Sequence, residues 1–361
     1  MRQTLNVDIK NDKQENYEIV ISDDLFSKLK EDIDLFTSGA NRLVVISQKV
    51  YKLYKKELNF DRKEVFVLKD GEIQKNFKNY EKILKKAFDL GLTRKDYIIA
   101  VGGGVVGDIA GFVASTYMRG INFVQVPTTL LSMVDSSVGG KTAIDIEGGK
   151  NIVGAFYQPK KVFININFLK TLDKKQYKSG LGEILKYAFI EKNCGYKQDL
   201  FFFEYLTLCA DKLIEKETMT LMRVIENCLL FKSSVVNQDE KEAGLRKVLN
   251  FGHTLGHALE AYTNYKKFTH GEAVVYGMFF IFAWAYSRGM IAYSYYRMAE
   301  DLLIKYGFKG LDLTVYSKEG LIDLMKHDKK ATSDKISFIV PVEKRTVKEV
   351  LLSIDEVEEM F

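Results

Sequence analysis

Residues 101–158 constrain the fold of this chain more than any other segment. The apolar, β-branched run at 97–101 predicts a buried strand, and the three glycines at 102–104 follow it directly. The apolar spacing of residues 105–118 then predicts a helix. A strand, a glycine turn and a helix N-terminus together form an anion site, because unpaired N–H groups and the helix dipole both point at the ligand. The segment therefore predicts an α/β fold with a turn that can bind the diphosphate of a dinucleotide.

The glycine turn has a second interpretation, because three glycines can simply make a tight connection between a strand and a helix. Its pattern is GGGxxGD and not GxGxxG. A second glycine cluster, VGGKT at 138–142, favours the binding interpretation. It does not fit the P-loop spacing GxxxxGK[ST], because Asp135 stands where the first glycine would be. We therefore interpret Lys141 as a phosphate-binding cation and not as part of a nucleoside-triphosphatase.

Predicted strands alternate with predicted helices through the first 172 residues, which indicates a Rossmann-like α/β domain with a mostly parallel sheet. Beyond this point the pattern changes to long helical periodicities, and we expect an all-α domain over residues 173–361, apart from one late strand at 336–340. The cleft between the two domains is the default place for an active site. The expected helices of the second domain span 177–191, 212–237, 246–263, 271–289 and 293–306.

Composition excludes several classes of function. The net charge of the 361 residues is only +5 and no block of like charges stands out, so nothing indicates a nucleic-acid partner. The N-terminal segment has no apolar signal core, and the apolar run at 273–286 is shorter than the roughly twenty residues that a membrane span needs. Three cysteines without CxxC spacing fit a reducing compartment better than a disulfide framework. We expect a cytoplasmic protein without a membrane partner.

Histidine is scarce, with four in all, and three of them are clustered: His253, His257 and His270. His253 and His257 are four residues apart on one helical face, so their spacing alone predicts that both bind one zinc ion. The segment HTLGH lacks the glutamate of HExxH, which excludes the metalloprotease motif. A carboxylate is the usual third ligand, and the candidates are Glu183, which follows a Gly-x-Gly segment, and Glu272.

Cationic residues lie close to each cluster of small residues. Any one of them could be a solvated surface charge, and Glu183 with Lys186 three positions later could form a surface ion pair of little energetic value. Together they favour a small substrate that carries phosphate and a carboxylate, because Arg offers a bidentate fork and Lys a point charge. These cations are Arg119, Lys141, Lys150, Lys186, Lys232, Arg246, Lys329 and Lys330.

Six segments resemble, in order, the signature blocks of the 3-dehydroquinate synthase family. They are GGGVVGDIAGFVASTYMRGI, VPTTLLSMVDSSVGGKTAID, GKNIVGAFYQP, GLGEILKYAFI, DEKEAGLRKVLNFGHTLGHALE and HGEAV. The resemblance implies a homodimeric shikimate-pathway lyase, with NAD bound by residues 1–172 and a metal ion and the substrate bound by residues 173–361. The implied reaction converts 3-deoxy-D-arabino-heptulosonate 7-phosphate into 3-dehydroquinate and phosphate. It combines transient oxidation by NAD, β-elimination of phosphate, reduction and intramolecular aldol closure.

The resemblance also implies roles for individual residues. A zinc or cobalt ion would be held by Glu183, His253 and His270, which replaces the spacing-based prediction for His257. Arg246 lies seven residues before His253, two turns along the expected helix, and would reach the substrate carboxylate. The catalytic residues would be Lys186, Lys232, Arg246, Asn250 and His257. Further substrate contacts would come from Asp135, Lys141, Asn151, one of Lys329 and Lys330, and Arg119 of the partner subunit. The NAD-binding residues would be Glu72, Lys75, Gly103, Gly104, Val105, Asp108, Thr128, Thr129, Lys141, Lys150 and Thr171.

One position departs from the family pattern. Many members carry an acidic residue after the second core strand to hold the adenosine ribose, whereas Ile46 is followed here by Ser47, Gln48 and Lys49. This position therefore leaves the choice between NAD and NADP open. Three alternatives also stay open: a sister sugar-phosphate cyclase, a metal-dependent polyol dehydrogenase and a non-catalytic nucleotide sensor. The cations expected at the substrate carboxylate disfavour a sister cyclase. The cluster of phosphate-binding residues disfavours a polyol dehydrogenase, and the complete set of metal ligands disfavours a non-catalytic sensor.

Overall fold

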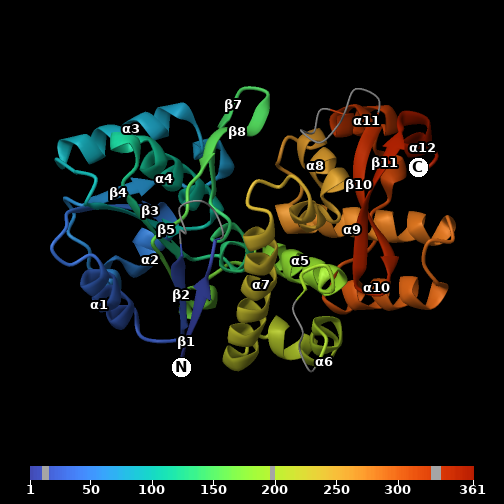
Figure 1. Ribbon diagram of the computed structural model, residues 1–361, viewed down its shortest axis with the longest axis horizontal. Helices are drawn as coiled ribbons and strands as arrows, with labels where there is room; N and C mark the ends of the chain where they lie inside the picture. The colour runs from blue at the N-terminus through green and yellow to red at the C-terminus, as the bar shows by residue number, and fades with distance from the viewer. Residues whose placement is uncertain (10–15, 196–199, 327–334) are drawn as a thin grey trace. The chain divides into compact units, whose positions relative to one another are not determined.

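A computed structural model describes residues 1–9, 16–195, 200–326 and 335–361 of the chain (Figure 1). These residues form two compact units. The first unit comprises Met1–Leu172 together with Leu221–Leu229, and the second comprises Asp173–Thr220 together with Leu230–Phe361. No helix in the described part of the chain is long and apolar enough to cross a membrane.

The first unit is built on a mostly parallel sheet that has seven strands among the described residues. Its spatial order is β1-β2-β9-β6-β5-β3-β4, and only the pair β1–β2 is antiparallel. The chain runs from β3 outward to β4 and then returns to β5 on the other side of β3, so the strand order reverses between β3 and β5. This topology confirms the predicted Rossmann-like α/β fold. The strands are β1 (Arg2–Val7), β2 (Tyr17–Ser22), β3 (Arg42–Ser47), β4 (Val65–Leu68), β5 (Tyr97–Gly102), β6 (Asn122–Pro127) and β9 (Lys161–Asn165).

Continuous apolar runs explain why the central strands are buried on both faces. The runs LVVI in β3 and IIAV in β5 are at most 2% exposed, which is typical of parallel strands covered by helices. Ile83 of α3 and Ile109 of α4 pack into the same core as Val45 and Phe123 of the strands. The helices of the unit are α1 (Phe26–Phe36), α2 (Gln48–Leu58), α3 (Phe77–Asp89) and α4 (Gly104–Thr116), with shorter turns η1 (Glu72–Gln74), η2 (Tyr117–Arg119) and η4 (Ile166–Lys170).

The second glycine cluster leads into a strand and not into a helix. Gly139 and Gly140 have φ angles of 99° and 66°, which glycine adopts at little cost, and they turn the chain into β7 (Lys141–Ile146). β7 pairs with β8 (Gly149–Phe156) in an antiparallel hairpin that the sequence analysis does not anticipate. Just before it, residues 132–136 form a single-turn π-helix, η3 (Ser132–Ser136), a conformation found mostly at functional sites.

The second unit is largely helical, as expected, and ends in a hairpin. The expected strand at 336–340 lies within β10 (Lys335–Glu343), which pairs with an additional strand, β11 (Thr346–Ser353). The three helices that matter most for the site are α5 (Lys174–Ile190), α8 (His253–Tyr262) and α9 (His270–Ser287). The others are α6 (Phe202–Ile214), α10 (Tyr293–Lys305), α11 (Lys318–Lys326) and α12 (Ile354–Glu358), with turns η5 (Leu245–Asn250) and η6 (Leu313–Val315). A further helix, α7 (Thr218–Gln238), contributes residues to both units, because Leu221–Leu229 belong to the first.

Two of the expected long helices were wrong because each is interrupted by a left-handed residue. The expected helix 246–263 consists of η5 and α8, separated at Gly252, whose φ is +78°. The expected helix 212–237 consists of the end of α6 and of α7, separated near Lys216, whose φ is +62°. Arg246 therefore does not lie two turns before His253 on one continuous helix.

The helices α5, α8 and α9 approach one another backbone to backbone through glycines. A Cβ on Gly271 of α9 would lie within 3.0 Å of the Ser179 carbonyl of α5, a separation that real Cβ atoms do not show. A Cβ on Gly277 would collide in the same way with the carbonyl of Gly252, just before α8. Behind this contact the rings of Phe189, Phe251 and Phe282 pack on one another with centroids 4.9–6.0 Å apart. These helices can hold their spacing only if the contact positions stay glycine.

We expect Gly271→Ala to destabilise the protein by at least about 2 kcal/mol, because overpacking against a rigid carbonyl outweighs the better helix propensity of alanine. Gly310→Ala is the matched control, since a Cβ there meets no atom within 4 Å and its φ is not positive. Urea unfolding of both variants measures the effect. Equal stability of the two variants would contradict the close packing of α5 and α9.

Candidate active site

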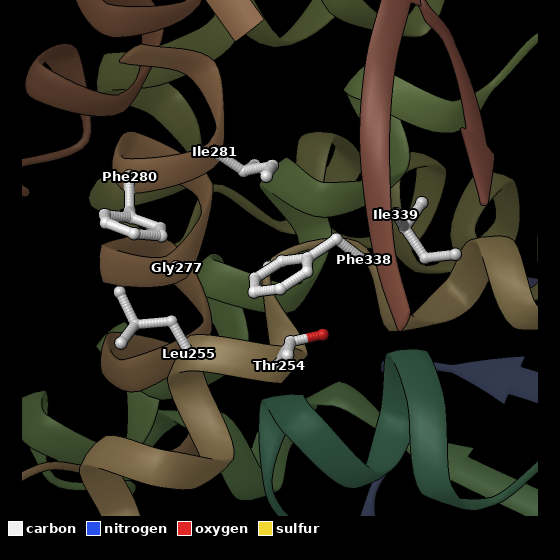
Figure 2. A pocket seen from close by; sticks show the side chains of 8 residues that line it. Thr254, Leu255, Gly277, Phe280, Ile281, Phe338 and Ile339 are labelled. Atoms are coloured by element: carbon white, nitrogen blue, oxygen red, sulfur yellow. The ribbon is translucent and has the colours of Figure 1, made fainter. Parts of the chain in front are cut away.

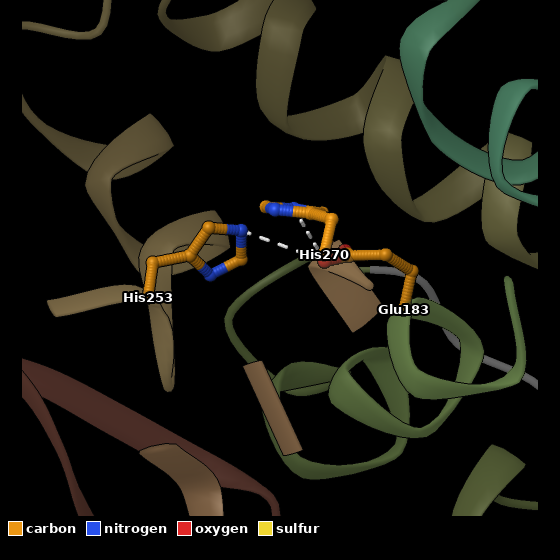
Figure 3. Close-up of side chains that lie close together, drawn as sticks. All are labelled: Glu183, His253 and His270. Carbon is orange, nitrogen blue, oxygen red and sulfur yellow. Dashed lines mark ion pairs between the residues drawn. The ribbon is translucent and has the colours of Figure 1, made fainter. Parts of the chain in front are cut away.

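Three side chains from three helices converge in the second unit (Figure 3). Glu183 comes from α5, His253 is the first residue of α8, and His270 is the first residue of α9. Nε2 of His253 lies 3.5 Å from Glu183 Oε1, and Nε2 of His270 lies 3.3 Å from the same oxygen. The three potential ligand atoms lie within 4.8 Å of one another. The structure thus brings together the three residues that the family resemblance assigns to the metal.

Each imidazole of this cluster is held by a contact at Nδ1, the nitrogen that does not face Glu183. Nδ1 of His253 lies 3.0 Å from the backbone carbonyl of Phe251, and Nδ1 of His270 lies 3.0 Å from Glu260 Oε2. When these Nδ1 atoms donate, the Nε2 lone pairs are directed toward Glu183. Histidines that bind a metal are usually anchored in this way.

The cluster fits a divalent metal ion. Glu183 Oε1 is buried and has no hydrogen-bond partner among the described residues, a costly arrangement unless a cation compensates it. With bonds of about 2.0–2.1 Å, two ligands on one tetrahedral ion are about 3.3–3.4 Å apart. The observed separations of 3.3 and 3.5 Å are close to this value. One carboxylate with two imidazoles is also a typical set of zinc ligands that leaves a coordination position open.

Neighbouring charged groups set the protonation states of Glu183 and His270. Burial alone would raise the pKa of Glu183, but the Lys186 ammonium and the His270 imidazole outweigh it and lower the pKa to about 2. Lys186 Nζ donates a hydrogen bond to Glu183 Oε2, so the other oxygen, Oε1, is the one that faces the imidazoles. Burial also disfavours the charged form of His270, yet the carboxylates of Glu260 and Glu183 raise its pKa to about 10.

Glu260 is a member of the cluster that the sequence analysis missed. It lies on α8 and is only 4% exposed. With His257 and His270 it forms a second group whose ligand atoms lie within 4.8 Å of one another. Its position was detectable, because it follows His257 by three residues and His253 by seven, on the same helical face.

Three further predicted residues of the second unit are on two elements. Lys232 lies on α7, while Arg246 and Asn250 lie on η5. Arg246 donates a hydrogen bond to the carbonyl of Glu240, and Asn250 Nδ2 donates to Glu242 Oε1 at 2.6 Å. Lys329 and Lys330 lie outside the described residues.

Glu272, the alternative carboxylate candidate, has a structural role. Its backbone N–H donates a hydrogen bond to the Thr269 hydroxyl, and its carboxylate accepts a hydrogen bond from the backbone N–H of Thr269. These two bonds form a capping box at the start of α9. Because its carboxylate is engaged at the helix end, Glu183 is the candidate that faces the histidines.

In the first unit the glycine turn lies where the strand order reverses. Gly103 precedes α4, and Gly104 and Val105 are its first residues, directly after β5. In open α/β sheets ligands bind at the carboxyl ends of the strands at this reversal. A Cβ on Gly103 would lie 3.0 Å from Thr129 Cγ2, so the loop after β6, which also carries Thr128, packs closely on the turn. Unpaired N–H groups at the start of α4 make this a place where a diphosphate can bind.

A buried lysine connects the predicted cofactor residues of this unit. Lys75 is 2% exposed, and its Nζ lies 2.5 Å from Asp108 Oδ2 on α4 and also bonds to Asn151 Oδ1 on β8. Glu72 Oε1 lies 3.8 Å from Lys75 Nζ and 3.4 Å from Lys150 Nζ. Burial alone would lower the pKa of Lys75, but the carboxylates of Asp108 and Glu72 raise it. The structure thus brings these five residues into one charged network.

The remaining predicted residues of the first unit are on separate loops and strand ends. Thr171 bonds to the Tyr54 hydroxyl at 2.6 Å. Asp135 lies in the π-helix η3, and Lys141 is the first residue of β7. Arg119 has a φ of +64° and lies between Met118 and Gly120, which also have positive φ. The end of β3 has no acid of its own, but the Lys49 backbone donates to the Asp70 carboxylate at 3.1 Å.

A small recess between α8, α9 and β10 is unsuited to a charged ligand (Figure 2). Its lining includes Leu255, Phe280, Ile281 and Phe338 and contains no ionisable side chain. The Thr254 hydroxyl, its one polar side-chain group, donates to the carbonyl of Ser337 at 2.9 Å. We interpret the recess as a packing gap.

Two solved structures share the whole fold. One is a 2-epi-5-epi-valiolone synthase from Streptomyces hygroscopicus subsp. jinggangensis 5008 with NAD+ and Zn2+ bound, which is 24% identical with a TM-score of 0.83 over 95% of each chain. The other is a 2-deoxy-scyllo-inosose synthase complexed with carbaglucose-6-phosphate, NAD+ and Co2+, which is 23% identical with a TM-score of 0.80 over 99% of each chain. The protein therefore has the fold of the dehydroquinate synthase-like cyclases.

Sequence comparison identifies the family within this class. The family model described as 3-dehydroquinate synthase N-terminal matches residues 65–179, and the model described as 3-dehydroquinate synthase C-terminal matches residues 180–331. A 3-dehydroquinate synthase of Alkaliphilus metalliredigens (strain QYMF) is 46% identical over 324 residues, which cover 88% of this chain and 89% of the relative. The chain belongs to the 3-dehydroquinate synthase family. This finding confirms the resemblance noted in the sequence.

We expect the protein to bind one zinc-class ion and to lose it in His253→Ala and His270→Ala. His257→Ala should retain the ion, because Glu183 Oε1 faces the other two rings. Elemental analysis of the purified variants after dialysis against trace metal measures the effect. Retention of the metal in the His253 variant with loss in the His257 variant would contradict the assignment.

Proposed function

We propose that this chain is an NAD- and divalent-metal-dependent 3-dehydroquinate synthase, a carbon–oxygen lyase that converts 3-deoxy-D-arabino-heptulosonate 7-phosphate into 3-dehydroquinate and phosphate. The observation that carries the proposal is the convergence of Glu183, His253 and His270 in a chain of this family. We further propose a homodimer that works in the cytoplasm.

The proposed cofactors match the donor groups on both units. Glu183, His253 and His270 would hold the metal ion, which supplies Lewis acidity to a substrate hydroxyl. The start of α4, with Gly103, Gly104 and Val105, would bind the diphosphate of NAD, which accepts a hydride and returns it within one turnover. Two structures of the same fold were solved with NAD+ and with Zn2+ or Co2+, which supports this pairing of cofactors.

The buried cations of the second unit suit an acidic sugar phosphate. Lys186, Lys232 and Arg246 are 1%, 6% and 1% exposed. An acidic sugar phosphate would offer these cations a phosphate and a carboxylate, and hydrogen bonds between such charged groups are stronger than those between neutral groups. Lys186 also fixes Glu183 through Oε2 and thereby orients Oε1 toward the histidines. Asp135, Lys141, Asn151 and Arg119 stay predicted substrate contacts.

Sequence identity favours the heptulosonate over the substrates of the sister cyclases. The 3-dehydroquinate synthase of Alkaliphilus metalliredigens is 46% identical, whereas the two other cyclases are 24% and 23% identical. Those two share the fold, so the difference between the activities must come from the substrate pocket and not from the scaffold.

The cofactor cycle gives the first test. With catalytic NAD+, the heptulosonate phosphate should release phosphate without net growth of NADH absorbance, because the hydride returns to the substrate. Phosphate release and absorbance at the NADH band are followed in one cuvette. NADH that accumulates in step with product would instead indicate a dehydrogenase.

The carboxylate contact gives the second test. We expect Arg246→Ala to lower kcat/KM on the heptulosonate phosphate at least about a hundredfold, near 2.7 kcal/mol, because the substrate carboxylate would lose its charged partner. Arg288→Ala is the matched control, since Arg288 is exposed and pairs with Glu359 on the surface. Metal content and NAD+ affinity should stay at the wild-type level in both variants.

The same experiment distinguishes the sister cyclases. The wild-type enzyme should be nearly inactive on sedoheptulose 7-phosphate, which lacks the carboxylate and would leave the cationic pocket uncompensated. Comparable turnover of the two substrates, or an Arg246→Ala variant that is unimpaired on the heptulosonate, would refute the carboxylate contact.

A further inference from the structure

The imidazole of His270 lies between two buried carboxylates that come from different helices. On one side its Nε2 is 3.3 Å from Glu183 Oε1, and on the other its Nδ1 is 3.0 Å from Glu260 Oε2. The side chains of Glu183 and Glu260 are 1% and 6% exposed. A ring held in this way has a fixed orientation, and each of its nitrogens has a fixed partner.

The two nitrogens cannot exchange roles without breaking one of these contacts. His270 is shared by two possible ligand groups, one with Glu183 and His253 and one with His257 and Glu260. An ion in the second group would need the Nδ1 lone pair and would displace the contact with Glu260. In the first group Glu183 Oε1 lacks a hydrogen-bond partner among the described residues, and His253 already has its Nδ1 at the Phe251 carbonyl. These contacts therefore favour an ion bound with Glu183 and His253, at the Nε2 atoms.

We infer that Glu260 is the positioning residue of the metal centre: its carboxylate accepts the Nδ1 proton of His270 and so fixes Nε2 as the metal donor. The inference rests on the proposed function, because it assumes that Glu183, His253 and His270 hold the ion. The two histidines are anchored unequally. His253 donates to a neutral carbonyl of its own chain segment, whereas His270 donates to a carboxylate, which makes the imidazole a stronger donor.

Glu260 also links the two helices that carry the histidine ligands. His270 is the first residue of α9, where the chain enters the helix, and Glu260 lies near the end of α8. Residues 263–269 connect the two helices. The Glu260 carboxylate thus links the His270 ring, at the start of α9, to the helix that carries His253. This contact fixes the distance between the two imidazoles.

The test compares Glu260→Gln with Glu272→Gln in the full-length protein. Both variants replace a glutamate carboxylate near His270, but Glu272 bonds to Thr269, and glutamine can keep that capping box. Dissociation constants for Zn2+ and Co2+ are measured by competition with a chromophoric chelator, and the visible spectrum of the Co2+ form is recorded. Glu260→Gln should bind both ions about 10–100-fold more weakly and shift the Co2+ bands, while Glu272→Gln stays within about twofold of wild type.

Two further measurements distinguish a positioning role of Glu260 from a general effect on the structure. NAD+ affinity and the circular dichroism of Glu260→Gln should match wild type, because the charge is removed at nearly constant shape. Should Glu260→Gln fold poorly, Glu260→Asp is measured in its place, since a shortened carboxylate keeps its charge but draws away from Nδ1. His257→Ala should keep wild-type metal affinity. Loss of affinity in both His257→Ala and Glu260→Gln would instead make Glu260 a ligand and overturn the inference.

The inference and the proposed function can fail separately. If wild-type enzyme releases phosphate from the heptulosonate phosphate but Glu260→Gln binds metal as tightly as wild type, with unchanged Co2+ bands, the positioning role is overturned and the function stands. If metal affinity depends on Glu260 as expected but no phosphate is released, the positioning role stands and the assigned reaction falls.

Discussion

The contact on which the second unit depends is the backbone-to-backbone approach of α9 to α5 and to the start of α8. Gly271 packs against the Ser179 carbonyl and Gly277 against the carbonyl of Gly252, positions where a single Cβ would force the helices apart. His270 adjoins Gly271, and Glu183 adjoins Gly182, where a Cβ would lie 2.4 Å from the Gly271 carbonyl. The backbones that carry these two side chains are therefore held at a close, fixed distance. A ligand set with bonds of about 2 Å needs this kind of rigidity.

One carboxylate then organises the charge of the cluster. Glu183 Oε2 accepts a hydrogen bond from Lys186, whereas Oε1 faces the two imidazoles. The lysine keeps the buried glutamate ionised, which burial alone would oppose. Glu260 fixes the orientation of the His270 ring from the other side, through its contact with Nδ1. These contacts therefore direct one carboxylate oxygen and two Nε2 atoms toward one point, as a divalent cation requires.

The sequence predicted the α/β fold of the first unit, because a β-branched run such as the one before Gly102, in alternation with helical patterns, is typical of buried parallel strands. It failed where helical periodicity continued through a break: nothing in the apolar spacing shows that Gly252 is left-handed. The β7–β8 hairpin was missed because Gly139 and Gly140 were interpreted only as part of a phosphate-binding segment, and not as the turn into a strand. Spacing alone favoured His257 as a ligand, because it cannot show the direction of a ring nitrogen, which depends on partners from other helices. The motif resemblance replaced His257 by His270.

The break at Gly252 is itself part of the site. If η5 and α8 were one helix, the Phe251 carbonyl would accept a helical hydrogen bond and would not be available to Nδ1 of His253. The left-handed glycine ends the first segment, frees this carbonyl and starts α8 at the histidine. Its lack of a side chain also admits the backbone of α9 at Val274 and Met278. A single residue thus sets the ring orientation of one imidazole and the helix spacing that brings the other within reach, which is why this position tolerates neither a side chain nor a helical φ.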